Sequence, residues 1–339
     1  MRRSMAAALV LTVLLFGGAY LAAGKTPAQE TVPDGAAQEQ SPQGQKDSGV
    51  QLAVKNGDAV ENMALDAYLQ GVVRGEMPAS FEQEALKAQA AAERTYVYYQ
   101  LAAGRKEAHP QADVCTDPAC CNAWLSEEAA REKWGGDFDG WERRIEEAVA
   151  ATDGQVALYD GQPIMAVFHS SSAGKTAGAG DVWSGEVPYL RSVDSPEGEE
   201  TVPNYYSAAV FSAAEAKSLL AKTHPELTLS GGPDRWFGAV ERDDSGRVRT
   251  VEVCGTALRG VELRRIFALR SACFTIDASA DKVTFRVTGY GHGVGMSQYG
   301  ANELARQGKT WQEILTWYYA DVTVGPAPET VQTAESVVD

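Results

Sequence analysis

The clearest pattern along the chain is an apolar segment that gives way to an alanine-rich helical segment. Residues 68–75 are largely apolar and lead into Glu76-Met77-Pro78. Proline disfavours helical geometry in the residue before it, so Met77 is expected to be extended and the chain is not expected to be helical at Glu76. The pattern therefore predicts a carboxylate on a bend immediately upstream of a helix.

The helix after this bend has signals at both ends. Ser80 and Gln83 have the spacing of a capping box, in which each side chain bonds the backbone N–H of the other residue. Strong helix formers continue to about residue 102, and Gly104 is typical of a helix C-cap. Lys87 and Arg94 are seven positions apart and share one helical face. With Glu76 nearby, that face is either a polar groove wall or a solvated surface.

The rest of the chain alternates short strand patterns with helical ones. Asp160-Gly161 separates two strand-like runs and predicts a hairpin. We expect strands, hairpins and helices as follows: strands at 51–60, 155–159, 164–169, 187–193, 274–276 and 283–287, a hairpin over 235–253, and helices over 126–150, 211–223 and 311–319. The helical pattern over 126–150 is interrupted at Gly135-Gly136, and we expect its role to be structural. The fold class is α+β, a single mixed domain over residues 51–325 arranged around a groove.

Three further polar features are candidates for binding. Residues 169–176 form a loop rich in hydroxyl groups, including Ser170, which suits recognition of a polyol. Tyr189 and Arg191 face the same side of the strand predicted after it. Alternate glycines surround His292 and precede Gln298, and such glycines allow close approach of the backbone to another group.

A cysteine-containing loop is a candidate metal site. His109, Cys115 and Cys121 are each separated from the next by five residues, and one imidazole with two thiolates suits Zn²⁺. The spacing matches none of the standard four-ligand zinc patterns. A disulfide from Cys115 to Cys120 or Cys121 is the alternative. Cys254 and Cys273 are expected to be small buried side chains or to form a single bridge.

The two ends of the chain have their own compositions. Arg2 and Arg3 precede an apolar run over residues 5–23, which is close to the ~20 residues of a membrane-spanning helix. We expect residues 5–23 to span the membrane as an uncleaved anchor, with residues 1–4 in the cytoplasm and the chain after the apolar run outside; cleavage after Ala22 or Ala23 is the alternative. Residues 24–50 have the composition of a flexible linker, and 326–339 that of a disordered acidic tail. A net charge of −16 argues against a nucleic-acid partner.

Several of these motifs together resemble the stage II sporulation protein D family. They are Tyr68 to Arg94 with its Glu-Met-Pro, the Ser-Ser-Ala-Gly segment before Val-Pro-Tyr-Leu-Arg, the stretch from Gly260 to Phe274, and Gly-His-Gly-Val-Gly-Met-Ser-Gln. The likeness covers most of residues 51–320 in the same order.

The resemblance implies a membrane-anchored lytic transglycosylase of endospore formers. It implies cleavage of peptide-stripped glycan strands between N-acetylmuramic acid and N-acetylglucosamine during engulfment, beside a peptidoglycan amidase and a membrane scaffold. The family's catalytic glutamate falls on Glu76. The positions that the resemblance assigns to substrate binding are Lys87, Arg94, Tyr189 and Arg191, to which we add Ser170, His292 and Gln298.

The resemblance also implies zinc bound by His109, Cys115 and Cys121, although Cys120 leaves open which of the two adjacent thiols is the ligand. No second catalytic carboxylate is evident, and a lytic transglycosylase needs one acid that later acts as base. Two other functions stay open: a non-catalytic glycan-binding scaffold for an amidase, and a zinc hydrolase in which the metal activates water.

Overall fold

The computed structural model describes residues 46–183 and 185–328. The expected anchor at residues 5–23, nearly all of the expected linker and most of the expected acidic tail lie outside these ranges. Within them, none of the helices combines the length and the apolar character that crossing a membrane requires. The described part is a mixture of helices and small sheets, which confirms the α+β class.

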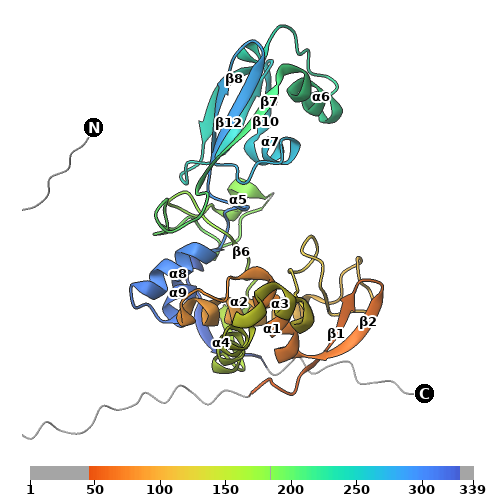
Figure 1. Ribbon diagram of the computed structural model, residues 1–339, viewed down its shortest axis with the longest axis vertical. Coiled ribbons are helices and arrows are strands. Elements are labelled where there is room, and N and C mark those ends of the chain that lie inside the picture. The colour runs from red at the N-terminus through yellow and green to blue at the C-terminus, as the bar shows by residue number, and fades with distance from the viewer. Residues whose placement is uncertain (1–45, 184, 329–339) are drawn as a thin grey trace, which may run out of the picture. The chain divides into compact units, whose positions relative to one another are not determined.

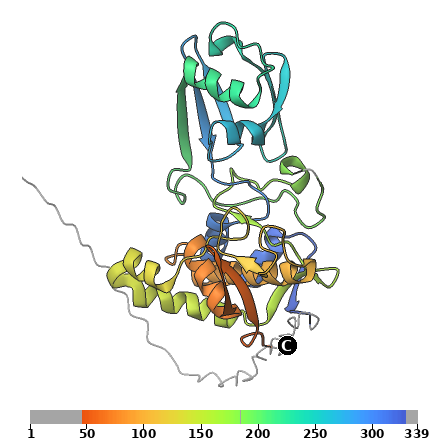
Figure 2. The ribbon, with the colours of Figure 1, turned by 90° about the vertical axis from the view of Figure 1, so that its right-hand side faces the viewer.

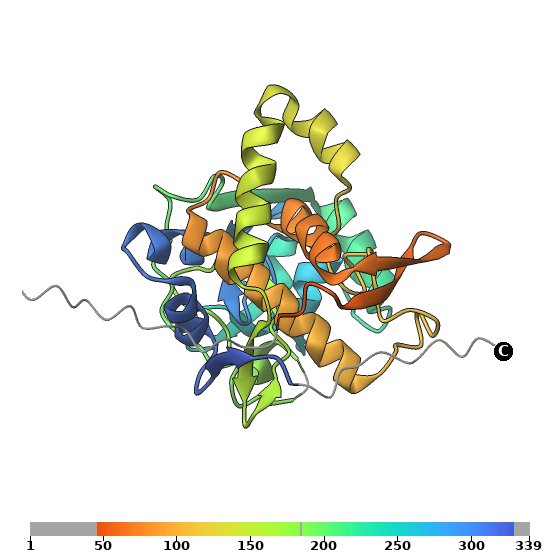
Figure 3. The same ribbon diagram turned by 90° about the horizontal axis from the view of Figure 1, so that it is seen from below.

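A first hydrophobic core is built around one long helix, α2 (Gln83–Ala103). This helix contacts α1 (Leu65–Glu76) and α4 (Phe138–Ala151), and Figure 3 shows α4 crossing it. It also contacts α8 (Gln298–Arg306) and α9 (Trp311–Tyr318). The alanines of α2 are small, so these neighbours approach its axis closely, and most of the helix is buried.

The junction between α1 and α2 differs from the predicted bend. Met77 is extended at φ −120° and ψ 138°, as Pro78 requires, but Glu76 is the last residue of helix α1. The predicted capping box is wrong, because α2 begins at Gln83 and has no side-chain cap. Gln83 instead donates its side-chain amide to the carbonyl oxygen of Arg144 at 2.9 Å. The predicted end is confirmed, with Gly104 at φ 87°.

Small sheets flank this first core. The strand expected over residues 51–60 is the start of a hairpin, β1 and β2, because Gly57 adopts a φ of 60° and turns the chain. Asp160 and Gly161 have φ values of 49° and 74°, which confirms the hairpin predicted at this turn. Its return strand is the two-residue β5 at 162–163, and the strand expected over 164–169 is reduced to residues 168–169. The sheets comprise β1 (Gln51–Asn56), β2 (Ala59–Ala64) and β3 (Val114–Cys115), then β4 (Gln155–Tyr159), β5 (Gln162–Pro163) and β14 (Thr323–Pro326).

A two-residue parallel pair links distant parts of the chain. Strand β6 (Phe168–His169) pairs with β13 (Met296–Ser297), which follows the glycine-rich segment. The strand expected over 187–193 is absent from the described residues, where this stretch forms turns and extended chain. Short elements complete the structure: α3 (Glu127–Trp134), η1 (Gly135–Asp137), α5 (Ala179–Val182) and η2 (Pro233–Arg235).

A second hydrophobic core lies between residues 206 and 288. Two antiparallel three-stranded sheets build it, with helices α6 and α7 beside them (Figures 1 and 2). The predicted hairpin over 235–253 is confirmed as β8 and β9. The elements are β7 (Tyr206–Ser212), α6 (Ala213–Thr223), β8 (Phe237–Arg242), β9 (Val248–Val253), β10 (Thr256–Arg259), α7 (Gly260–Ile266), β11 (Phe274–Ala278) and β12 (Lys282–Thr288).

Candidate active site

Glu76 lies at the wall of a pocket of about 410 Å³. Residues 74–80, from the end of α1 and the following bend, form one side of the pocket. Lys133 and Trp134 from α3 and Trp141 from α4 form another. The two indole rings meet edge to face, with centroids 5.6 Å apart. The pocket therefore joins one carboxylic acid to broad aromatic surface, a combination suited to a polyhydroxylated ligand with apolar ring faces.

The surroundings of Glu76 favour its protonated form. Burial raises the pKa of its carboxyl above the ordinary value, and a hydrogen bond from the backbone N–H of Ala123 partly opposes this rise. That N–H donates to Oε1 of Glu76 at 2.6 Å. The nearby cation of Arg74 is engaged elsewhere, since its Nε donates to Oε2 of Glu142 at 2.8 Å. Glu76 is thus equipped to carry a proton at a higher pH than an exposed glutamate.

A second carboxyl group, Glu93 of α2, lies close enough to Glu76 for their charges to interact. Glu93 is fully buried, and burial followed by the charge of Glu76 raises its pKa well above the ordinary value. Its Oε1 accepts from Nε2 of Gln89 at 2.8 Å, and its Oε2 accepts from Nδ2 of Asn122 at 2.6 Å. Among the described residues, no cation forms an ion pair with it.

The segment 122–125 is pressed against α1 just before Glu76. The backbone N–H of Leu125 donates to the carbonyl oxygen of Gly71 at 2.9 Å. A Cβ at Gly71 would lie 1.9 Å from the indole nitrogen of Trp124, and one at Gly75 would lie 2.7 Å from the carbonyl oxygen of Ala123. Glycine is needed at both places because no side chain fits between helix and segment.

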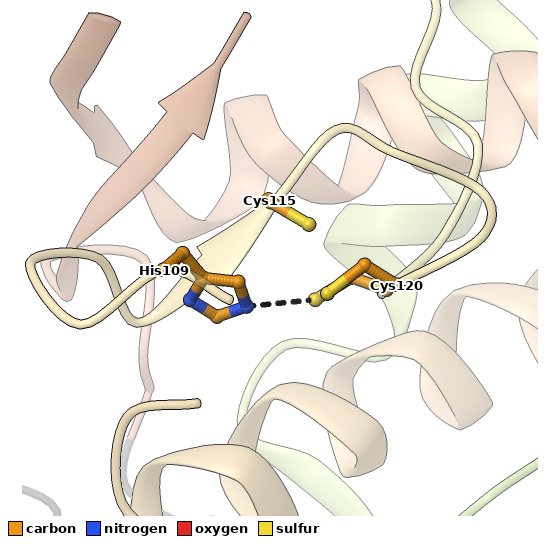
Figure 4. Close-up of side chains that lie close together, drawn as sticks. His109, Cys115 and Cys120 are labelled. Atoms are coloured by element: carbon orange, nitrogen blue, oxygen red, sulfur yellow. Dashed lines mark hydrogen bonds between the residues drawn. The ribbon is translucent and has the colours of Figure 1, made fainter. Parts of the chain in front are cut away.

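The loop that ends in this segment carries a four-residue cluster of metal-binding side chains. The donor atoms of His109, Cys115, Cys120 and Cys121 all lie within 4.8 Å of one another. Figure 4 shows three of these side chains, His109, Cys115 and Cys120, pointing toward a common point. All five cysteines are free, so the alternative of a disulfide in this loop is not supported, and neither is a bridge between Cys254 and Cys273.

Groups around the cluster suit a bound cation. Nδ1 of His109 donates to the carbonyl oxygen of Ala112 at 2.9 Å, which leaves Nε2 unprotonated as a ligand atom, 3.5 Å from Sγ of Cys121. Burial raises the pKa of the Cys115 thiol to about 12, so its thiolate requires a positive charge nearby. Three thiolates and one imidazole form a standard structural zinc set. Lys106, whose Nζ lies 3.5 Å from Sγ of Cys121, offsets the surplus negative charge of such a set.

Of the predicted substrate-binding residues, all of which are described, Gln298 alone hydrogen-bonds to Glu76. Its Nε2 donates to the backbone carbonyl oxygen of Glu76 at 3.0 Å. Lys87 does not line the pocket and pairs with Glu84 at 2.6 Å. Arg94 is fully buried and does not lie on a groove wall.

Arg94 is the centre of a buried polar network. It pairs with Asp47 and with Asp66, each at 3.0 Å, and donates to the hydroxyl of Thr152 at 2.8 Å. The seven-residue spacing from Lys87 was consistent with a polar face, but this part of α2 faces protein instead of solvent.

The other predicted residues lie away from the lining of this pocket. The hydroxyl of Tyr189 accepts from the N–H of Met165 at 3.0 Å, and Arg191 is exposed and pairs with Asp321 at 2.8 Å. The carbonyl oxygen of Ser170 accepts from the N–H of Tyr299 at 3.1 Å. These contacts leave the roles of Tyr189, Arg191 and Ser170 in binding as predictions.

The glycine-rich segment packs against the chain itself. Gly291 and Gly295 have φ values of 116° and 71°, and a Cβ at either would lie within 2.7 Å of residues 167–169. Burial, and next the charge of Arg247, lower the pKa of His292 to about 4, so its imidazole is neutral near pH 7. The predicted close approach of the glycine-rich backbone to another group is confirmed. The group is the backbone of residues 167–169, which includes strand β6.

Comparison with known proteins places the chain in a family. A family model described as stage II sporulation protein matches residues 54–159. Stage II sporulation protein D of Bacillus subtilis (strain 168) is 36% identical over 270 residues, which cover 79% of this chain and 76% of that protein. The chain belongs to the stage II sporulation protein D family.

The chain is also similar to two further proteins. Stage II sporulation protein D of Bacillus amyloliquefaciens is 35% identical over 284 residues, covering 83% of this chain and 80% of that protein. A Bacillus subtilis protein named amidase enhancer is 28% identical over 305 residues, covering 76% of this chain and 40% of that protein. The family model ends at residue 159, so it contains Glu76, Glu93, the cysteine cluster and both pocket tryptophans.

The sequence did not reveal several residues of this site. Trp134 and Trp141 belong to a helical pattern interpreted as structural, although their seven-residue spacing could have indicated a shared aromatic face. Glu93 has no sequence signal, because a glutamate in an alanine-rich helix is equally typical of an exposed position.

Proposed function

We propose that this protein is a membrane-anchored lytic transglycosylase of the peptidoglycan. It cleaves glycan strands between N-acetylmuramic acid and N-acetylglucosamine, on strands without stem peptides, during engulfment in sporulation. The observation that carries this proposal is the half-buried Glu76, with a raised pKa, on the wall of a pocket lined by Trp134 and Trp141.

One carboxyl group performs both proton transfers. The protonated carboxyl of Glu76 donates to the glycosidic oxygen, and the bond from C1 of N-acetylmuramic acid to that oxygen breaks. The resulting carboxylate accepts the proton of the C6 hydroxyl of the same sugar, whose oxygen bonds to C1. The products are a 1,6-anhydro-N-acetylmuramic acid end and a free 4-hydroxyl on the leaving sugar, and no water is consumed.

Glu93 does not serve as the second carboxylate of a hydrolytic pair. A glycosidase that uses water or a covalent intermediate places its second carboxylate against the sugar ring. Glu93 is fully buried, and Gln89 and Asn122 occupy its oxygens, so no sugar reaches it. This supports intramolecular cleavage by Glu76.

The cysteine cluster is proposed to hold one structural Zn²⁺. Its four ligands are His109, Cys115, Cys120 and Cys121, which fill a tetrahedral site and leave no position for an activated water. A filled four-ligand site argues against a zinc hydrolase, and we propose that Cys120 and Cys121 are both ligands. When bound, the ion would cross-link the loop through its four ligands.

The anchor at residues 5–23 and the location of the catalytic part outside the cytoplasm remain part of the proposal. They rest on the apolar run preceded by Arg2 and Arg3. The partners proposed are the glycan strands, a peptidoglycan amidase and the membrane scaffold of the engulfment complex.

Product analysis tests the reaction. Peptide-free glycan strands are digested with the wild-type protein, and the chain ends are identified by mass spectrometry. We expect anhydro ends that disappear with Glu76→Gln and persist with Glu146→Gln, a matched change at an exposed glutamate on α4. Reducing ends would instead establish a muramidase.

A non-catalytic scaffold is the second candidate, and the relative named amidase enhancer favours it. In that case Glu76→Gln retains full cell-wall remodelling in sporulating cells, while substitution of Tyr189 or Arg191 abolishes glycan binding.

A further inference from the structure

Two neighbouring residues of one loop hold two different carboxyl groups. The side chain of Asn122 donates to Glu93 at 2.6 Å, and the backbone N–H of Ala123 donates to Glu76 at 2.6 Å. Cys121, a member of the metal-binding cluster, immediately precedes them. The position of the Ala123 N–H is therefore set by the same short segment that Glu93 anchors.

Glu93 is an unusual residue for its location. A buried carboxyl without a cation is costly unless hydrogen bonds satisfy it, and here both donors are neutral amides. An apolar residue of similar size would fit the surrounding alanine-rich core at a lower cost. What the carboxyl adds is a fixed acceptor for Asn122 beneath the loop.

We propose that Glu93 is a positioning residue for Glu76. It acts through Asn122, which fixes the segment 122–125 so that the N–H of Ala123 meets one oxygen of Glu76. The other oxygen of Glu76 is then directed to the pocket. This inference rests on the proposed function of Glu76 as the acid.

The glycines of α1 make this arrangement tight. Gly75 lies directly under the carbonyl group of Ala123, and Gly71 lies under Trp124. The segment therefore packs directly against the helix. We expect a displacement of its anchor to displace the Ala123 N–H as well.

Paired substitutions separate positioning from charge. Glu93→Gln keeps an acceptor for Asn122. Its new amide can donate to Gln89 once the Gln89 amide turns its Oε1, which has no partner among the described residues, toward it. Glu93→Leu removes the acceptor while preserving apolar packing, and Asn122→Ala removes the donor from the other side. Gln100→Leu is the control, because it replaces a buried polar side chain of α2 about two turns away.

Two readouts are measured on each variant of the full chain. The first is kcat and KM on peptide-free glycan. The second is the rate of amide hydrogen exchange, by mass spectrometry, in peptides covering residues 121–125, which needs no activity. We expect Glu93→Leu and Asn122→Ala to lower kcat on the order of tenfold or more, with KM within about twofold, and to speed exchange by a similar factor.

Glu93→Gln and Gln100→Leu are expected to retain wild-type kcat and exchange. If Glu93→Gln loses as much kcat as Glu93→Leu, the carboxyl acts through its charge or proton and the positioning role is overturned. Unchanged exchange and kcat in Glu93→Leu would overturn the coupling itself. A wild-type protein that forms no anhydro ends would refute the proposed function, while the exchange measurement would still decide whether Glu93 anchors the loop.

Discussion

The side-chain amide of Gln298 donates a hydrogen bond of 3.0 Å to the backbone carbonyl oxygen of Glu76, 222 positions earlier in the chain. That carbonyl belongs to the last residue of α1, where the helix offers no internal donor. Gln298 itself is the first residue of α8 and is 6% exposed. A residue of the glycine-rich motif thus fixes the backbone that carries the proposed acid.

Gln298→Ala should therefore lower activity more than stability. Losing one buried hydrogen bond costs about 1 to 3 kcal/mol, and the Glu76 backbone gains freedom. We expect kcat to fall about tenfold, measured with the anhydro-end assay, and the melting temperature to fall by a few degrees. Gln307→Ala, at the exposed C-cap of the same helix, is the control and should change neither. Equal losses in both variants would contradict a specific role for Gln298.

The pH dependence of cleavage should report the raised pKa of Glu76. The acid must be protonated to donate, so kcat/KM falls as pH rises through its pKa. Because burial raises that pKa, the fall should occur clearly above the ~4.3 of an ordinary glutamate. Charged groups that face Glu76 are Glu93, Arg74 and Lys133, and Arg74 is neutralised by Glu142. A fall centred at an ordinary glutamate pKa would count against Glu76 as the proton donor.

Local signals in the sequence were reliable where local contacts decide the structure. Gly104 ends α2 and Asp160-Gly161 forms a turn, since each depends on backbone preferences of its own residues. The start of α2 was mispredicted because its N-cap residue, Glu82, donates its backbone N–H to Asn302, 220 positions away. No local pattern contains that contact.

The site follows the same rule. Glu76 was recognised because Glu-Met-Pro is a contiguous motif, and the cysteine loop because its ligands lie within thirteen positions. Glu93 carries no such local signal, because its role depends on a contact with Asn122 and on complete burial. Helical spacing places Lys87 and Arg94 on a shared face, but it does not indicate whether that face meets solvent or protein.

Trp134→Ala should weaken glycan binding. The indole contributes pocket surface, and an aromatic contact of this kind is worth about 0.5 to 1.5 kcal/mol. We expect KM to rise about threefold to tenfold with a smaller change in kcat, while Trp134→Tyr retains most of the affinity. Trp317→Ala is the control, because that indole is 41% exposed on α9 and does not line the pocket. A KM that is the same in all three variants would place the glycan elsewhere.

Arg94→Ala should lower the free energy of unfolding and should leave sugar binding unchanged. The guanidinium is fully buried and paired with Asp47, whose own pKa burial raises to about 6. Removing it leaves the buried carboxylate of Asp47 unpaired, at a cost of about 3 to 5 kcal/mol. Urea unfolding should show this loss, and Arg131→Ala, an exposed ion pair on α3, should show less than about 1 kcal/mol. A stable Arg94→Ala protein with a raised KM would restore the groove assignment.

Removal of metal from the cysteine cluster should loosen the segment that holds Glu76 without abolishing the chemistry. Atomic emission should detect one zinc per chain in the purified protein, and little in Cys115→Ser or Cys120→Ser, because a three-ligand remnant binds more weakly. Cys254→Ser, outside the cluster, is the control. After chelation, hydrogen exchange over residues 121–125 should rise and kcat should fall, while residual products keep their anhydro ends. A chelated protein that loses all cleavage while exchange stays unchanged would indicate direct participation of the metal in the reaction.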